Sequence, residues 1–89
     1  MITYNDIYKA LRKEKYSEQL QVLDKKFMQD VSDYLKEKKE MAEKKEDMFS
    51  DALIKTKKQL ENAVSIFKEL ILRRKKKILQ LIFVANETG

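Results

Sequence analysis

Three carboxylates are spaced so that they share one face of a predicted helix: Asp33, Glu37 and Glu40, at positions i, i+4 and i+7. Helical bundles that hold two metal ions use carboxylates on such faces, together with Glu-x-x-His pairs on neighbouring helices. The chain has no His, and no second helix shows an inward-facing carboxylate pattern. We therefore interpret these carboxylates as a solvated surface and predict no metal site.

The composition also argues against other common catalytic chemistry. Without Cys or His, the chain lacks a thiol nucleophile, a thiolate metal site and the usual general base. It contains no Gly-rich phosphate loop and no nucleophile elbow. We expect a binding or assembly protein that is not an enzyme, with no catalytic residue and no cofactor.

The length and the turn residues indicate the fold class. Eighty-nine residues, 43% hydrophobic and 39% charged, are typical of one small domain built from long helices with large solvated faces. Pro is absent and the only Gly is Gly89, so tight hairpin turns between strands are not expected. The sequence predicts an all-α fold, a small helical bundle or long helical hairpin of three to five helices. We assign the domain to residues 1–85 and the start of a linker or tail to residues 86–89.

The apolar periodicity places a first helix at residues 4–15, followed by a connector at residues 16–23. Thr3 or Asn5 can cap this helix, and Asp24 can cap a second helix at residues 25–46. The predicted inner positions of these two helices are Tyr4, Ile7, Tyr8 and Leu11 in the first, and Phe27, Val31, Tyr34 and Leu35 in the second.

Residues 47–50 are the predicted turn before a third helical stretch at residues 51–72, which continues as a last segment at residues 73–85. The predicted inner positions of the third stretch are Leu53, Leu60, Ala63, Val64, Phe67, Leu70 and Ile71. In the second helix, the charged part from Lys36 to Asp47 also allows a simpler interpretation, a free-standing antiparallel coiled-coil spacer.

Basic residues are concentrated in residues 55–77, which hold nine basic and two acidic side chains, a local net charge of +7. Such a segment can attract nucleic acid or an acidic protein surface. An alternative function is therefore a basic helical DNA-binding module. Its candidate DNA-contacting residues are Lys55, Lys57, Lys58, Lys75 and Lys76.

The five consecutive cations from Arg73 to Lys77 cannot form one patch, because successive helical residues are about 100° apart. If the helix is continuous, Arg74 lies on the apolar line and needs a carboxylate partner or a route to solvent. Otherwise the helix breaks near residues 72–74. We interpret Arg73, Arg74 and Lys77 as a structural basic element.

The segment from Ile78 to Ala85 is apolar almost all the way round. A surface helix of a small monomer would have a polar side, so we expect this segment to meet another chain. The predicted subunit-interface residues are Ile78, Leu79, Leu81, Ile82 and Phe83.

Three sequence elements resemble the α-helical A domain of archaeal GINS subunits. They are Leu11-Arg12-Lys13-Glu14-Lys15, the Leu20, Leu23-Asp24, Phe27, Val31 and Tyr34-Leu35 pattern, and the run from Leu72 to Leu81. The resemblance is to the class whose A domain comes first, here without the β-rich B domain.

This resemblance implies a non-catalytic scaffold of the archaeal DNA replication helicase complex. It implies a tetramer with itself or a paralogous GINS subunit, which bridges the MCM helicase and a RecJ-like protein. The sequence leaves open whether the tetramer is homomeric or heteromeric. No signal peptide is visible and the longest apolar stretch is shorter than the roughly 20 residues of a spanning helix, so we expect no membrane partner and a cytoplasmic, nucleoid-associated location.

Overall fold

The computed structural model describes residues 2–43 and 51–88. These residues form three helices, α1 (Tyr4–Tyr16), α2 (Lys25–Ala42) and α3 (Asp51–Thr88), and contain no strand. The prediction of an all-α fold is thus confirmed. The turn predicted at residues 47–50 and the predicted end of the second helix at residue 46 lie outside the described residues.

Side-chain caps start the first two helices. The Thr3 backbone N–H donates to the Asp6 carboxylate over 2.8 Å, and the Asp6 backbone N–H donates to the Thr3 hydroxyl over 3.4 Å. The hydrogen bond from the Thr3 backbone lowers the pKa of Asp6. Asp24 accepts a 2.8 Å hydrogen bond from the Phe27 backbone N–H at the start of α2. Each cap satisfies an N–H that the helix itself leaves free.

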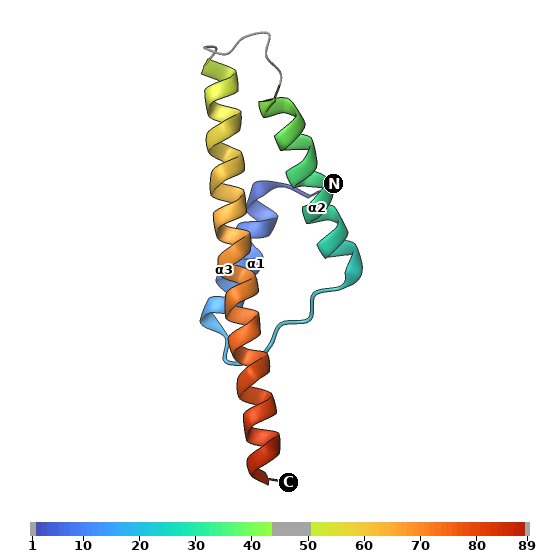
Figure 1. Cartoon of the computed structure of the whole chain (residues 1–89), viewed down its shortest axis with the longest axis vertical. Coiled ribbons are helices and arrows are strands. Elements are labelled where there is room, and N and C mark those ends of the chain that lie inside the picture. The colour runs from blue at the N-terminus through green and yellow to red at the C-terminus, as the bar shows by residue number, and fades with distance from the viewer. Residues whose placement is uncertain (1, 44–50, 89) are drawn as a thin grey trace.

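Helix α3 is continuous through residues 72–74, where the sequence also allowed a break. Its 38 residues contain neither Gly nor Pro, so no residue interrupts the backbone hydrogen bonds. At about 1.5 Å per residue, this helix accounts for most of the 60 Å long axis of the molecule (Figure 1). Residues 86–88, predicted as the start of a linker or tail, continue the helix.

Both shorter helices pack against α3. In Figure 1, α1 runs in the same direction as α3, and α2 runs opposite to it. Ala10, Leu11 and Leu70 form the central cluster, and partly buried side chains of α2, α3 and the connector pack on it. The other buried apolar side chains among the described residues are Ile7, Val31, Leu53 and Ala63.

The inner face of α1 is rotated relative to the predicted one. Tyr8 is 42% exposed, whereas Ala10 and Glu14 are buried. The buried face follows Ile7, Ala10, Leu11 and Glu14, the i, i+3, i+4, i+7 pattern of a helix stripe. The prediction for Tyr8 was wrong because Tyr8 lies outside this stripe. The centroid of its ring is 6.0 Å from Cζ of Arg12.

Within the part of the chain that the structure describes, no helix combines the length and the apolar character needed to cross a membrane. The charged positions of α3 explain this result, since the basic run at residues 73–77 interrupts its apolar sequence.

Candidate assembly interface

Because α3 is continuous, Arg74 lies on the side of the helix that faces α1. Its Nη1 atom is 2.7 Å from Glu14 Oε1 and 2.7 Å from the carbonyl oxygen of Gln21. The Glu14 side chain is fully buried and that of Arg74 is 18% exposed. Glu14 is therefore the carboxylate partner that the sequence position of Arg74 requires.

Lys77 lies one turn further along α3 and contacts the same region. Its Nζ donates to Glu14 Oε2 over 2.7 Å, to the Glu14 carbonyl over 2.6 Å and to the Gln19 carbonyl over 2.9 Å. A lysine ammonium has three N–H donors, so these three acceptors use all of them. Lys77 thus joins α3 to the end of α1 and to the connector.

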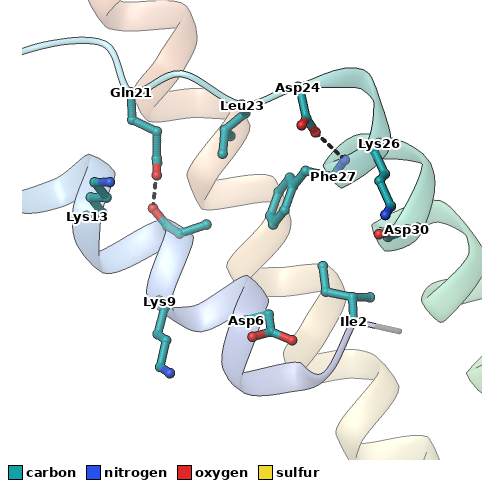
Figure 2. Close-up of a pocket in the computed structure, with 11 residues that line it drawn as sticks. Ile2, Asp6, Lys9, Lys13, Gln21, Leu23, Asp24, Lys26, Phe27 and Asp30 are labelled. Atoms are coloured by element: carbon teal, nitrogen blue, oxygen red, sulfur yellow. Dashed lines mark hydrogen bonds between the residues drawn. The ribbon is translucent and has the colours of Figure 1, made fainter.

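Gln21 completes the set of donors around Glu14. Its backbone N–H donates to Glu14 Oε2 over 3.2 Å, and its side-chain amide donates to Glu14 Oε1 over 3.1 Å. The same amide donates to the carbonyl of Ala10 over 2.8 Å, as Figure 2 shows. We refer to Glu14, Gln21, Arg74 and Lys77 as the Glu14 cluster.

The cluster keeps Glu14 ionised. Burial alone would raise the pKa of Glu14, but hydrogen bonds from Lys77, Gln21 and Arg74 outweigh this effect and lower the pKa to about 2. The buried carboxylate faces two cations, and every buried side-chain polar atom of the described residues has a hydrogen-bond partner. The cluster therefore meets the condition under which a buried charge is tolerated.

The remaining predicted basic residues lie outside this cluster. Arg73, grouped by sequence with Arg74 and Lys77, instead pairs with Glu69 over 3.0 Å on the accessible side of α3. The five candidate DNA-contacting lysines are all exposed: Lys55, Lys57, Lys58, Lys75 and Lys76. They form two groups. Lys75 follows Lys58 by 17 residue numbers, which separates the groups by about 25 Å along the helix.

The five predicted interface residues lie where α3 extends past α1 and the connector (Figure 1). We call residues 78–86 of α3 the helix end. The exposed fractions of the five interface side chains there range from 42% for Ile78 to 65% for Leu79. In contrast, Leu53 and Leu70 of the same helix are buried. Exposed apolar surface of this kind is typical of interaction sites.

The interface residues divide between two sides of the helix end. With about 100° between successive residues, Ile78, Leu81 and Ile82 continue the line that faces α1 higher up the helix. Leu79 and Phe83 lie on the opposite side. The helix end can therefore contact two neighbouring elements at once.

A shallow groove of about 470 Å³ lies between α1, the connector and the start of α2 (Figure 2). Apolar residues line it, and its charged residues are of both signs: Lys9, Lys13 and Lys26, with Asp6, Asp24 and Asp30. This mixture does not select a ligand of either charge. No group of three or more metal-ligating side chains occurs among the described residues.

Sequence reasoning missed Glu14 and Gln21 as members of the site. A signal for Glu14 was present, because it follows Ile7 and Leu11 at i+7 and i+3 on the apolar line of the first helix. A carboxylate on that line and Arg74 on the line of α3 form a complementary pair. Gln21 gave no comparable signal, since the connector has no periodicity that predicts its orientation.

Comparison with known proteins does not place the chain in a family. A scan against protein-family models, a search of the curated proteins and a search of the solved structures each found no match. The helix end and the Glu14 cluster are therefore the features of the chain from which a function can be inferred.

Proposed function

We propose that the protein is a non-catalytic assembly subunit that oligomerises through the helix end. The observation that carries this proposal is the exposure of Ile78, Leu79, Leu81, Ile82 and Phe83 on a helix that projects from the body. Burying one such side chain contributes roughly 1.5–3 kcal/mol. Several of them together are enough to drive association with another chain.

The Glu14 cluster supports the same function. Arg74 and Lys77 are bonded to α1 and the connector just before Ile78, where α3 leaves the body. This contact holds α3 at the start of the helix end and fixes its direction relative to α1. A surface that is already ordered loses less entropy when it binds.

The arrangement of the three GINS-like elements also supports a GINS-type role. Glu14 of the first element bonds Arg74 and Lys77 of the third. Leu23 and Phe27 of the second element pack on the cluster of Ala10, Leu11 and Leu70. Elements far apart in sequence thus form one structural unit. In this proposal the chain is a GINS-like A domain that forms a tetramer with itself or a paralogous subunit and bridges MCM and a RecJ-like protein in DNA replication.

Size-exclusion chromatography with light scattering tests the assembly proposal. We expect the wild-type chain to be oligomeric at micromolar concentration, and the variant Leu81→Asp/Ile82→Asp to be monomeric. Ile54→Asp is the matched control, because Ile54 is an exposed apolar residue at the other end of α3. A wild-type monomer at micromolar concentration would contradict the proposal, as would equal losses in both variants.

DNA binding is the second candidate function, favoured by the exposure of both lysine groups on α3. However, three of the nine basic side chains at residues 55–77 bond within the molecule: Arg73, Arg74 and Lys77. If the others bind duplex DNA, the affinity should fall with salt, with a log–log slope near −0.9 per neutralised phosphate. Fluorescence anisotropy at low salt measures this, and the absence of binding there would exclude the DNA-binding function.

A further inference from the structure

The outer side of α3 carries an apolar stripe that begins on the body of the molecule. Leu72, Leu79 and Phe83 are 52%, 65% and 62% exposed. Their spacing of seven and four residues places them in a band about 40° wide on the helix surface. We call these three residues the outer stripe. Since Leu72 precedes Arg74 and Lys77, the outer stripe is not confined to the helix end.

Exposed lysines border the outer stripe. Lys68, Lys75 and Lys76 are all exposed, and the ion pairs of this part of α3 involve Arg73, Arg74 and Lys77 instead. The nearby carboxylate of Glu69 is bonded to Arg73. The surface therefore combines an apolar centre with positive edges that the described residues do not neutralise.

The outer stripe supplies three apolar positions of a two-helix coiled-coil seam. If Leu72 and Leu79 occupy d positions, Phe83 occupies an a position, Glu69 and Lys76 occupy the two a positions before it, and Lys68 and Lys75 occupy g positions. Polar residues at a positions set the register of the partner, and charges at g positions select the opposite charge at e positions of the facing helix. The partner that fits is a helix with apolar core positions and Asp or Glu beside them.

Among the described residues, no helix has this acidic character. Basic side chains outnumber acidic ones in every helix, four to two in α1, five to four in α2 and nine to four in α3. A second copy would thus place one basic helix against another, which is unfavourable when like charges are adjacent. An acidic helix of a different protein avoids this contact between like charges.

We propose that the outer stripe, with Lys68, Lys75 and Lys76, binds an acidic amphipathic helix of a different protein. This inference deepens the proposed function and rests on it in one respect, since Leu79 and Phe83 also belong to the helix end. It assigns the outer side of α3 to the acidic partner. Ile78, Leu81 and Ile82, on the opposite side, remain for association between subunits.

A pair of designed peptides tests this proposal. The probe is a fluorescein-labelled, four-heptad helical peptide with Leu at its a and d positions and Glu at its e and g positions. The matched peptide has Lys in place of every Glu. Fluorescence anisotropy with the full chain should show binding of the Glu peptide and not of the Lys peptide.

Charge reversal on the protein should exchange this preference. We expect Lys68→Glu/Lys75→Glu/Lys76→Glu to bind the Glu peptide at least about tenfold more weakly and to bind the Lys peptide. The control Lys55→Glu/Lys57→Glu/Lys58→Glu changes the charge equally at the other end of α3 and should retain the wild-type preference. Leu72→Ala should weaken binding of the Glu peptide by about tenfold.

Three outcomes would overturn the proposal: no binding of the Glu peptide, equal binding of both peptides, or an equal loss in the control variant. Capture of the chain by phosphatidylserine vesicles through Leu72, without peptide binding, would assign the stripe to a membrane and also overturn it. Light scattering on the same samples separates this result from the proposed function. A wild-type monomer that binds the Glu peptide would contradict self-assembly alone, whereas an oligomer that ignores it would contradict the acidic partner alone.

Discussion

Two parts of α3 have similar apolar side chains in different surroundings. Along residues 53–77, α1 and α2 cover one side of the helix and bury Leu53, Ala63 and Leu70. Along residues 78–86, the described side chains are exposed on every side. The Glu14 cluster lies at the boundary. Packing of α1 and α2 on one side of α3 thus stabilises the small fold, whereas the apolar residues beyond these two helices are left accessible to other chains.

Adjacent basic residues of α3 also lie in different surroundings. Lys77 bonds three acceptors on α1 and the connector, whereas Lys76 is exposed. Arg74 bonds Glu14, whereas Lys75 is exposed. Because neighbouring positions are about 100° apart, the basic run supplies structural contacts on one side of α3 and a positive surface on the other.

The largest expected effect comes from removing the carboxylate at the boundary. Glu14→Ala leaves Arg74 and Lys77 partly buried without a counter-ion, and we expect the free energy of unfolding to fall by about 4 kcal/mol. Urea denaturation at pH 7 measures the change. Glu69→Ala is the control, because its ion pair with Arg73 is accessible to solvent and should contribute less than about 1 kcal/mol. Similar losses in the two variants would show that the cluster does not hold α1 against α3.

Acid should act on the covered part and not on the helix end. The pKa of Glu14 lies below its ordinary value of 4.5, at about 2 in the folded protein, so the folded state resists protonation at this site. The stabilisation by Glu14 is therefore complete above pH 4.5 and is lost as the pH falls toward 2. A shift of this size corresponds to about 3 kcal/mol.

Urea denaturation at a series of pH values measures this loss. In Glu14→Gln the fall in stability between pH 4.5 and 2 should be much smaller than in the wild type, while Glu61→Gln, on the exposed side of α3, should retain it. A wild-type slope in the Glu14→Gln variant would assign the acid sensitivity to other carboxylates.

Truncation of one leucine in each part of α3 tests how much a covered and an uncovered side chain each contribute to stability. Leu70→Ala removes a fully buried side chain and should reduce the free energy of unfolding by about 3 kcal/mol. Leu81→Ala should change it by less than about 0.5 kcal/mol in dilute protein. At high protein concentration Leu81→Ala should become destabilising, because association then contributes to stability. A large effect of Leu81→Ala in dilute protein would mean that the helix end is covered within one molecule.

The smallest expected effect distinguishes the two neighbouring lysines. Lys77→Met removes three hydrogen bonds but leaves Glu14 bonded to Arg74, so we expect a loss of about 2 kcal/mol. Lys76→Met should change stability by less than about 0.5 kcal/mol. Thermal denaturation followed by circular dichroism compares the two variants. Equal midpoints would indicate that the boundary lies elsewhere on α3.

Local features of the chain were predictable because they depend on neighbouring residues. Position and spacing along one helix predicted Asp24 as a cap, Thr3 as one of two cap candidates, and the apolar lines of α2 and α3. The absence of internal Gly and Pro can be read directly from the sequence. The same spacing predicted that Arg74, in a continuous helix, would need a carboxylate partner or a route to solvent. The inner face of α1 was partly wrong, since Ala10 rather than Tyr8 is buried. The predicted and observed faces share Ile7 and Leu11 and differ by only about 60° around the helix, so periodicity alone does not separate them.

The amino-acid sequence is enough to predict the helices, their caps and the almost entirely apolar segment after Lys77. The axial offset of α1 along α3 is a property of the packed fold. That offset places Glu14 beside Arg74 and Lys77, 60 and 63 positions away in the chain, and leaves Ile78 and the residues after it uncovered. The physical reason is that helical periodicity specifies which side of a helix is apolar, whereas the packing of whole faces specifies which residues meet.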